Sequence, residues 1–261
     1  MSEAGIRYNS GVISLVMNSR DDERFQRAKQ WYADALNGTD YELVRIPDAL
    51  GMCEGYNRGI ARAKGDTIIL SHDDVQMLST DLAERVEAHL CRFDLIGVAG
   101  TTRVCNPFWA AAGPPHVYGQ IVQARAEKLT AWIWGAPDRA VANIQGMDGV
   151  FLACRRSLFN RVKFDAAYTG WHLYDLDFTF SAYLAGFQLA VVNDLYPVHH
   201  EQHDRIVDDA AWRQDAGTFM HKFGSRMPRP IERAYAATQV RVETLDACVE
   251  VMTPPHWPSV G

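Results

Sequence analysis

Acidic and histidine side chains gather at three places in this 261-residue chain. The sequence His-Asp-Asp at 72–74 follows an apolar run, Asp175 and Asp177 open an amphipathic segment, and three histidines lie within residues 199–203. Adjacent carboxylates repel each other unless a cation lies between them, and carboxylate oxygens suit Mg²⁺ and Mn²⁺. Such a cation can neutralise a phosphate leaving group, and a further carboxylate can accept a proton from a nucleophile.

Each of these groups also has a purely structural interpretation. Asp is common where strands turn, so Asp73 and Asp74 also fit the capping of a following turn. Asp175 in the first turn of a helix would interact favourably with the helix dipole, by roughly 0.3 to 1 kcal/mol. The histidine run also fits a solvated polar loop. The surrounding residues therefore decide between structure and chemistry.

The densest stretch of metal-capable residues is Tyr196-Pro197-Val198-His199-His200-Glu201-Gln202-His203-Asp204. His199 and His203 are four residues apart and would share a helix face, which together with Glu201 or Asp204 would suit a zinc hydrolase. The segment from His200 to His203 is one residue too short for the H-E-x-x-H motif, so the zincin mechanism does not fit.

Strands and helices are expected to alternate over the first hundred residues. Apolar runs predict strands at 12–17, 41–46, 67–70 and 95–99, and amphipathic patterns predict helices at 22–36, from 52 to a C-cap at Gly65, and after an N-cap at Ser79. This order indicates an α/β fold with a mostly parallel central sheet flanked by helices. Ligands bind beyond the carboxyl ends of such strands, so Asn18 and the His-Asp-Asp sequence should lie at one edge.

The rest of the chain is expected to be less regular at first. Residues 101–145 are rich in proline and tryptophan and suggest an irregular insertion over the site. A strand at 150–154, a helix at about 175–185 and a strand at 187–192 follow. Apolar residues spaced by four and three over 231–249 predict a long amphipathic helix, which either packs on its own domain or joins two subunits in a homodimer.

Composition excludes several classes of function. Lys and Arg total 26 and Asp and Glu total 32, giving a net charge of −6 without a concentrated basic patch, so nucleic acid is not an expected partner. The five cysteines form no C-x-x-C pair, which fits a reducing cytoplasm. No apolar run reaches the roughly 18 residues of a membrane span. We expect a soluble cytoplasmic protein, with peripheral association to the inner face of the membrane left open.

The segment from Gly51 to Asp74, GMCEGYNRGIARAKGDTIILSHDD, resembles the signature of family 2-like glycosyltransferases of the GT-A fold. In that family an Asn-x-Gly-Ile helix leads through Ala-x-Gly-Asp into an apolar strand and then the DXD motif. Other landmarks extend the resemblance over roughly residues 11–205. Ser71 departs from the pattern where the family has the first Asp of DXD, while Asp73 matches the second.

The resemblance implies a GT-A catalytic domain over residues 1–227. It would comprise a Rossmann-like nucleotide-binding half at about 11–100 and an acceptor-binding half at about 101–227, followed by a C-terminal helical extension at 228–261. The implied reaction moves a sugar, with inversion, from a nucleotide diphosphate sugar to a saccharide or glycoconjugate acceptor, for polysaccharide or glycoconjugate synthesis. A UDP-sugar is the favoured donor, and the implied cofactor is Mn²⁺ or Mg²⁺.

The resemblance also assigns roles near the strand ends. The metal would be held by Asp73 and Asp74, completed by a late histidine at His199 or His200. The residues expected around the donor and its nucleotide are Asn18, Arg20, Asp48, Asn57, Ser71, His72 and Asp73.

The segment Gly170-Trp171-His172-Leu173-Tyr174-Asp175-Leu176-Asp177-Phe178 looks like the family's Glu-Asp-x-Asp segment, with Tyr174 in place of the Glu. By that resemblance Asp175 is the general base. Asp148, which precedes a strand similar to the one under the family's acceptor site, is expected to bind sugar or acceptor. Trp171, His172 and Asp177 complete the expected acceptor site, although a single tryptophan commonly packs in the core.

Three other functions stay open at this stage. A metal-dependent hydrolase would use the cluster from His199 to His203 and bind zinc tightly. A nucleotide-sugar binding module without turnover would explain the departures at Ser71 and Tyr174. A sugar nucleotidyltransferase could share the fold, but the first strand leads into Asn-Ser-Arg-Asp-Asp at 18–22 and not into a glycine-rich phosphate loop.

Overall fold

The alternating strands and helices build a mixed seven-stranded sheet. The computed structural model describes residues 12–126, 128–135, 138–200, 210–229 and 237–254. The order across the central sheet is β2 (Tyr41–Ile46), β1 (Ile13–Asn18), β3 (Thr67–Ser71), β11 (Phe151–Arg155), β5 (Leu95–Gly97), β12 (Leu189–Val192) and β9 (Ala140–Val141). β2, β1, β3, β5 and β12 run in one direction, while β11 and β9 run against it. The expected α/β fold is confirmed, with a mixed rather than purely parallel sheet.

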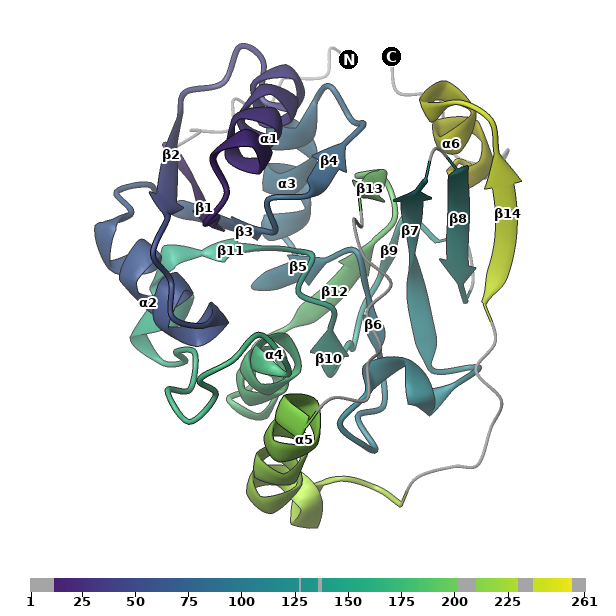
Figure 1. Cartoon of the computed structure of the whole chain (residues 1–261). Helices are drawn as coiled ribbons and strands as arrows, with labels where there is room; N and C mark the ends of the chain where they lie inside the picture. The colour runs from purple at the N-terminus through teal and green to yellow at the C-terminus, as the bar shows by residue number, and fades with distance from the viewer. Residues whose placement is uncertain (1–11, 127, 136–137, 201–209, 230–236, 255–261) are drawn as a thin grey trace, which may run out of the picture.

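Helices cover both faces of this sheet (Figure 1). They are α1 (Asp22–Ala35), α2 (Met52–Arg62), α3 (Leu82–Leu90) and α4 (Tyr174–Leu184), with α5 (Ala210–Phe223) packed on α4 and followed by the short turn η3 (Gly224–Arg226). α1 and α3 lie over one face and α2 and α4 over the other (Figure 1). β1 and β3 are buried along their whole length, because apolar side chains face helices on both sides.

A second sheet continues from the far end of the first. Its path is β10 (Gly146–Met147), β6 (Ala99–Thr101), β7 (Val117–Arg125), β13 (Pro197–His199) and β4 (Val75–Met77), and β8 (Lys128–Trp134) joins β7 and β14 (Thr238–Val242). β7 and β8 form an antiparallel hairpin.

The expectation of an irregular insertion at 101–145 is therefore wrong. Three of the prolines that suggested it, at 107, 114 and 115, lie outside strands, around the turn η1 (Trp109–Ala112), and the fourth, at 137, is outside the described residues. Trp132 and Trp134 belong to β8 itself. Aromatic residues are favoured in strands, so these tryptophans support the strand rather than a loop.

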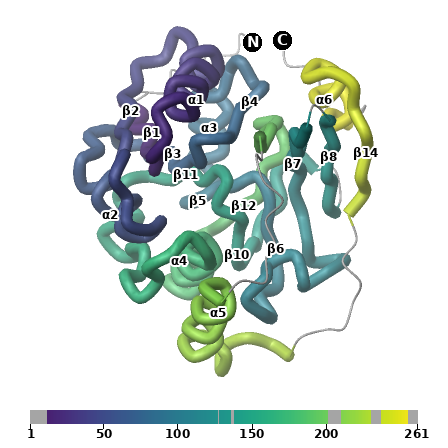
Figure 2. The backbone as a smooth tube through the Cα atoms, viewed as in Figure 1, coloured from purple at the N-terminus to yellow at the C-terminus, as the bar shows by residue number. Residues whose placement is uncertain are grey.

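The C-terminal segment also differs from its expectation. The predicted long helix at 231–249 is wrong, because Thr238–Val242 is β14 and only Leu245–Met252 forms a helix, α6. Residues 231–236 lie outside the described part of the chain. α6 and β14 bury Val242, Cys248 and Met252 in a small second cluster, together with Val122 of β7 and Val198 of β13. Figure 2 shows both elements at the opposite end of the molecule from β2.

Two expected helix ends also need correction. The Ser79 hydroxyl donates to the Leu195 carbonyl oxygen at 3.2 Å, and Asp81, not Ser79, occupies the N-cap position of α3. α2 has its C-cap at Ala63. Gly65 instead packs so closely on the backbone of β1 that a Cβ there would collide with the Val12 carbonyl oxygen.

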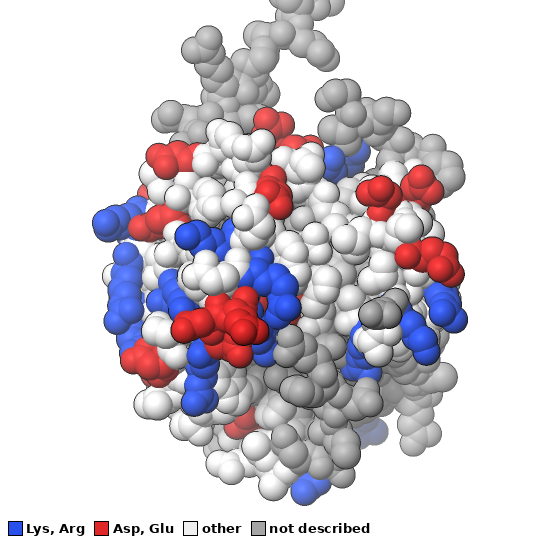
Figure 3. Space-filling model, turned by 45° about the horizontal axis from the view of Figure 1, so that its top comes forward, with Lys and Arg blue, Asp and Glu red and all other residues white. Residues whose placement is uncertain are grey.

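Two features of the described residues bear on charge and on membrane spans. On the face viewed in Figure 3, basic side chains lie among acidic ones, and the described residues form no broad basic patch there. No helix in the described segments has the length and apolar character needed to cross a membrane.

An ion pair between a buried carboxylate and a half-buried ammonium group fastens α5 to the sheet domain. Asp177 in α4 is 1% exposed, and both of its carboxylate oxygens accept hydrogen bonds from the Lys222 ammonium group, at 2.9 and 2.8 Å. Lys222 also contacts Asp165 at 2.6 Å.

Lys222→Met should lower the free energy of unfolding by about 3–5 kcal/mol, because it leaves a buried carboxylate without its cation. Urea unfolding measures this change.

The double variant Lys222→Met/Asp177→Asn is the matched control. It removes the buried charge together with its partner and should recover most of the lost stability. A loss below about 1 kcal/mol for Lys222→Met would contradict the buried-pair interpretation.

Candidate functional site

Two polar loops meet at the carboxyl edge of the central sheet. β1 and β3 are parallel neighbours with Met17 opposite Ser71, so the loops that follow them lie side by side. They border a pocket of about 260 Å³ lined by Asn18, Arg20, Asp21, Arg24, Met52, His72, Asp73, Asp74 and Trp171. Six of these nine residues were expected at a site, so the structure brings the first strand's loop and the His-Asp-Asp segment together as predicted.

A larger open depression, of about 660 Å³, lies at the other end of β3. Its arginines are engaged in the fold: Arg155 pairs with Glu87 at 2.7 Å, and Arg156 donates to the Ala63 carbonyl oxygen at 2.9 Å. These contacts hold β11 and α2 in place, so we assign this depression no chemistry.

Arg24 binds both adjacent aspartates of the pocket. Its Nη2 lies 2.9 Å from Asp73 Oδ1 and 2.6 Å from Asp74 Oδ2, and the Ser19 hydroxyl donates to Asp73 Oδ2 at 2.8 Å. Arg24 comes from the first turn of α1, which Asp21 caps by accepting the Arg24 N–H. Burial outweighs Ser19 and Arg24 and raises the pKa of Asp73. Arg24 was not expected at the site, because its contacts join it to residues about 50 positions away in the sequence.

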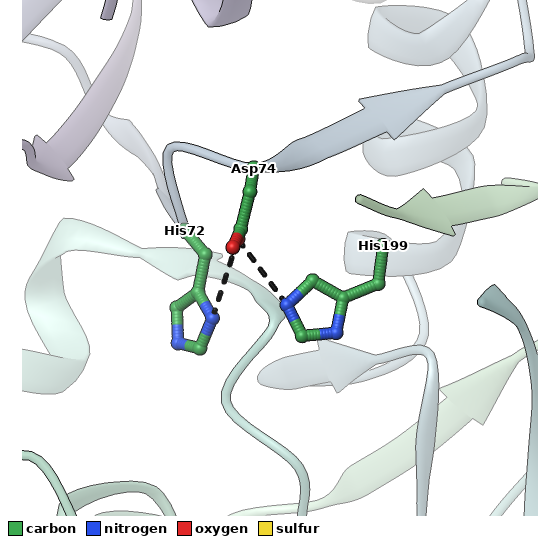
Figure 4. A group of neighbouring side chains, drawn as sticks. All are labelled: His72, Asp74 and His199. Carbon is green, nitrogen blue, oxygen red and sulfur yellow. Dashed lines mark ion pairs between the residues drawn. The ribbon is translucent and has the colours of Figure 1, made fainter. Parts of the chain in front are cut away.

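Asp74 also faces two imidazoles (Figure 4). Its Oδ1 lies 3.2 Å from His199 Nε2 and 4.0 Å from His72 Nδ1. The three potential ligand atoms lie within 4.8 Å of one another. Burial alone would raise the pKa of Asp74, but His199, His72 and Arg24 outweigh it and hold that pKa well below its usual range. The group is thus an anionic oxygen flanked by two imidazole nitrogens.

Strand pairing distinguishes His199 from His200. β13 runs antiparallel to β4 with His199 opposite Val75, which places His199 next to Asp74. His200 turns away: its Nε2 lies 3.0 Å from Gln76 Oε1, and its ring stacks on Trp31 with centroids 4.5 Å apart. Burial lowers the pKa of His200. Of the two expected histidines, the structure brings His199 to the carboxylates.

Asp175 lies in the first turn of α4. Its Oδ2 accepts the Gly149 N–H at 2.9 Å and its Oδ1 accepts the Leu176 N–H at 2.8 Å. Burial, together with the negative charge of Asp148, outweighs these donors and raises the pKa of Asp175 to about 7. A carboxyl group with that pKa can accept a proton near neutral pH.

Asp148 is held next to this group by its own donors. The Trp109 indole N–H donates to its Oδ2 at 3.1 Å and the Val150 N–H to its Oδ1 at 3.0 Å. Trp109 in turn packs edge-on against Trp134, with ring centroids 5.5 Å apart. The sequence carries no signal for the Trp109 contact, because the partners are 39 residues apart and Trp109 lies in a proline-rich segment.

The two departures from the family pattern lie beneath the pocket. Ser71 is fully buried, accepts the Tyr32 hydroxyl at 2.7 Å and donates to the His72 carbonyl oxygen at 3.0 Å. These hydrogen bonds hold the end of β3 in place, and Ser71 does not face the pocket. Tyr174 is also buried, and its hydroxyl lies 2.5 Å from His72 Nε2.

Other expected site residues are engaged elsewhere. Asp48 is exposed and pairs with Arg58 at 3.0 Å. The Asn57 amide exchanges two hydrogen bonds with the Phe164 backbone, and Asp177 binds Lys222 as described above. None of the three lines the pocket.

Trp171 and His172 lie beyond the turn that leads into α4. Trp171, 37% exposed, lies at the pocket, whereas half-buried His172 is not among its lining residues. Glu201, His203 and Asp204, which the zinc-hydrolase alternative needs, fall outside the described residues.

Comparison with known proteins gives one family match. A family model described as "Glycosyltransferase like family" matches residues 14–223, well over half of the chain. A crystal structure of GalNAc-T7 with UDP, GalNAc and Mn²⁺ superposes with a TM-score of 0.49 and 12% identity, covering 75% of this chain and 45% of that one. The chain thus spans less than half the length of that protein. No curated protein matches the sequence.

The raised pKa of Asp175 predicts a pH-dependent effect on stability. The folded state binds an extra proton between the ordinary value of 3.8 and about 7, so Asp175 stabilises the fold at low pH and this contribution is lost as pH rises through about 7. Asp175→Asn removes the titration. Its melting temperature relative to wild type should therefore be higher at pH 8 than at pH 5. An equal difference at both pH values would contradict the raised pKa.

Proposed function

This chain belongs to the glycosyltransferase-like family, and on that premise we propose that it transfers a sugar, with inversion, from a nucleotide diphosphate sugar to the hydroxyl of a saccharide or glycoconjugate. The observation that supports the proposal is that the group formed by His72, Asp74 and His199 is connected to Asp175 through Tyr174. Tyr174 contacts His72 of this group, and the next residue, Asp175, is the base. Uridine diphosphate sugars are the first donors to test.

The residues around Asp74 fit a divalent cation. Asp74 Oδ1 is buried and lies 3.2 Å from His199 Nε2 and 4.0 Å from His72 Nδ1, so the three atoms border one small space. Two imidazole nitrogens and a carboxylate oxygen form a ligand set that suits Mn²⁺ better than Mg²⁺, which prefers oxygen ligands. We assign the cation to His72, Asp74 and His199. When bound, it would supply Lewis-acid neutralisation of the leaving diphosphate.

The remaining pocket residues suit the donor. Arg20 and Arg24 line the pocket, and a guanidinium group binds phosphate oxygens with paired hydrogen bonds. Asn18 donates to the Met52 carbonyl oxygen at 3.2 Å, while its buried Oδ1 has no donor among the described residues. That oxygen packs against Gly55 of α2, where a Cβ would collide with it, so Asn18 shapes the wall of the pocket. Asp73 lies on the same wall, between Ser19 and Arg24.

The acceptor belongs on the side of Asp175. Its carboxylate takes the acceptor proton as the hydroxyl oxygen attacks the anomeric carbon. Asp148 lies beside the base, and exposed Trp171 offers an aromatic face at the pocket. These residues would orient the acceptor, while the hydrogen bonds from Gly149 and Leu176 hold the base in place.

One observation also favours a second candidate. Two histidines and one carboxylate are the protein ligands of many catalytic zinc sites, so a metal-dependent hydrolase remains an alternative. It predicts tightly bound zinc, which elemental analysis of the purified protein would detect. A binding module without turnover would show nucleotide diphosphate binding by calorimetry and no product with any acceptor.

Two neighbouring aspartates test the cation site. Asp74→Asn should weaken Mn²⁺ binding by at least about 10-fold, the size typical of lost support to a metal ligand. Asp73→Asn makes the same charge change one residue away and should weaken it less, because Asp73 faces Ser19 and Arg24. Calorimetric titration with Mn²⁺ measures both. The reverse order of effects would overturn the assignment to Asp74.

The pH dependence of transfer tests the base. The assay uses a saturating concentration of metal and a donor sugar that the enzyme turns over. Under these conditions kcat/KM should rise with pH through about 7 and then level off, because Asp175 must be ionised to act. Asp148→Asn removes the neighbouring negative charge and should move this rise to lower pH. A rise that stays in place or moves to higher pH would contradict the role of Asp148.

A further inference from the structure

The buried Tyr174 hydroxyl makes a polar contact with the proposed cation site. Tyr174 is 4% exposed, and its Oη lies 2.5 Å from His72 Nε2. A neutral phenol oxygen can accept a hydrogen bond from an imidazole N–H.

The backbone makes room for this contact. Gly149 lies so close to Tyr174 that a Cβ there would collide with the hydroxyl oxygen. The N–H of the same glycine donates to Asp175 Oδ2 at 2.9 Å. A side chain at position 149 would therefore disturb the His72 contact and the base together.

The contact also decides which ring nitrogen of His72 faces Asp74. With Nε2 beside Tyr174, Nδ1 points toward Asp74 Oδ1, 4.0 Å away (Figure 4). A histidine that ligates a metal with one nitrogen usually donates the N–H of the other to a fixed acceptor, which sets the tautomer and the ring orientation.

We propose that Tyr174 is a positioning residue: its oxygen accepts the His72 Nε2–H and so directs the Nδ1 lone pair toward the space shared with Asp74 and His199. This inference rests on the proposed cation site. It does not depend on which sugar or acceptor is used. It also gives Tyr174 a role at the position where the family pattern has Glu.

The alternative is that Tyr174 serves only as a core side chain. Its ring packs near Tyr56 and Phe164, with centroids 5.8 and 6.2 Å apart, so the aromatic body has a structural role. Tyr174→Phe keeps the ring and removes the hydroxyl. Tyr56→Phe is the matched control, because Tyr56 is fully buried and its hydroxyl has no hydrogen-bond partner among the described residues.

The test measures Mn²⁺ binding through the electron paramagnetic resonance signal of the free ion. Tyr174→Phe should weaken binding by about 10-fold or more, as expected when the support of a metal-ligating histidine is lost. Tyr56→Phe should stay within about twofold of wild type, since it removes no contact to a ligand. Equal affinities for the two variants would overturn the positioning role.

A second measurement uses the wild-type protein and so does not depend on how a variant folds. With Zn²⁺ as a diamagnetic probe, ¹⁵N imidazole spectra should show His72 with its proton on Nε2 and the metal on Nδ1. A proton on Nδ1 would overturn the inference.

Failure of this inference is distinguishable from failure of the proposed function. A wild-type protein that binds no Mn²⁺ would remove the cation site and the inference with it. Unchanged Mn²⁺ affinity in Tyr174→Phe, with sugar transfer by the wild type, would remove the inference alone.

Discussion

The site depends on keeping one carboxylate ionised in a largely enclosed position. Asp74 lies where the chain leaves β3 for β4, and burial by itself would favour its neutral form. An unpaired charge there would be costly, so the surrounding elements must supply compensation. α1 provides Arg24, β13 provides His199, and the end of β3 provides His72. Both sheets therefore contribute a side chain to this compensation.

The two central carboxylates have opposite environments. Asp74 is surrounded by cationic or protonatable groups, and its pKa falls. Asp175 has a negative neighbour in Asp148 and receives only backbone N–H groups, and its pKa rises. Groups whose environments separate their pKa values in this way take different chemical roles. One suits an electrostatic partner for a cation and the other a proton acceptor.

Local pattern located the elements up to β3, but it did not predict β4 or the division of the strand expected at 95–99 between β5 and β6. The strand at 41–46 has the predicted bounds, and β1, β3 and α2 differ by few residues, because apolar runs and amphipathic spacing are local properties. The pattern misled at 231–249, where Thr238, Val240 and Val242 alternate as in a strand, while Thr238 and Val242 also fit the helical spacing of four.

The spacing of residues along the chain does not show which side chains contact each other in the fold. His199 and His200 are adjacent, and only antiparallel pairing of β13 with β4 brings the first to Asp74. Asn57 and Asp177 fit their motifs but bind Phe164 and Lys222 across the fold. Arg24, Trp109 and Tyr174 emerge as site residues from such tertiary contacts. The resemblance located the pocket, whereas the identity of each contact required three-dimensional structure.

The ligands proposed for the cation come from both sheets. His72 follows β3 of the central sheet, while His199 belongs to β13 of the second sheet, and Asp74 joins the two at the start of β4. A bound ion would therefore link the two sheets at the point where they meet. Any sliding of one sheet against the other would separate the two imidazoles. The cation affinity would therefore depend on how closely the two sheets are held together at this point.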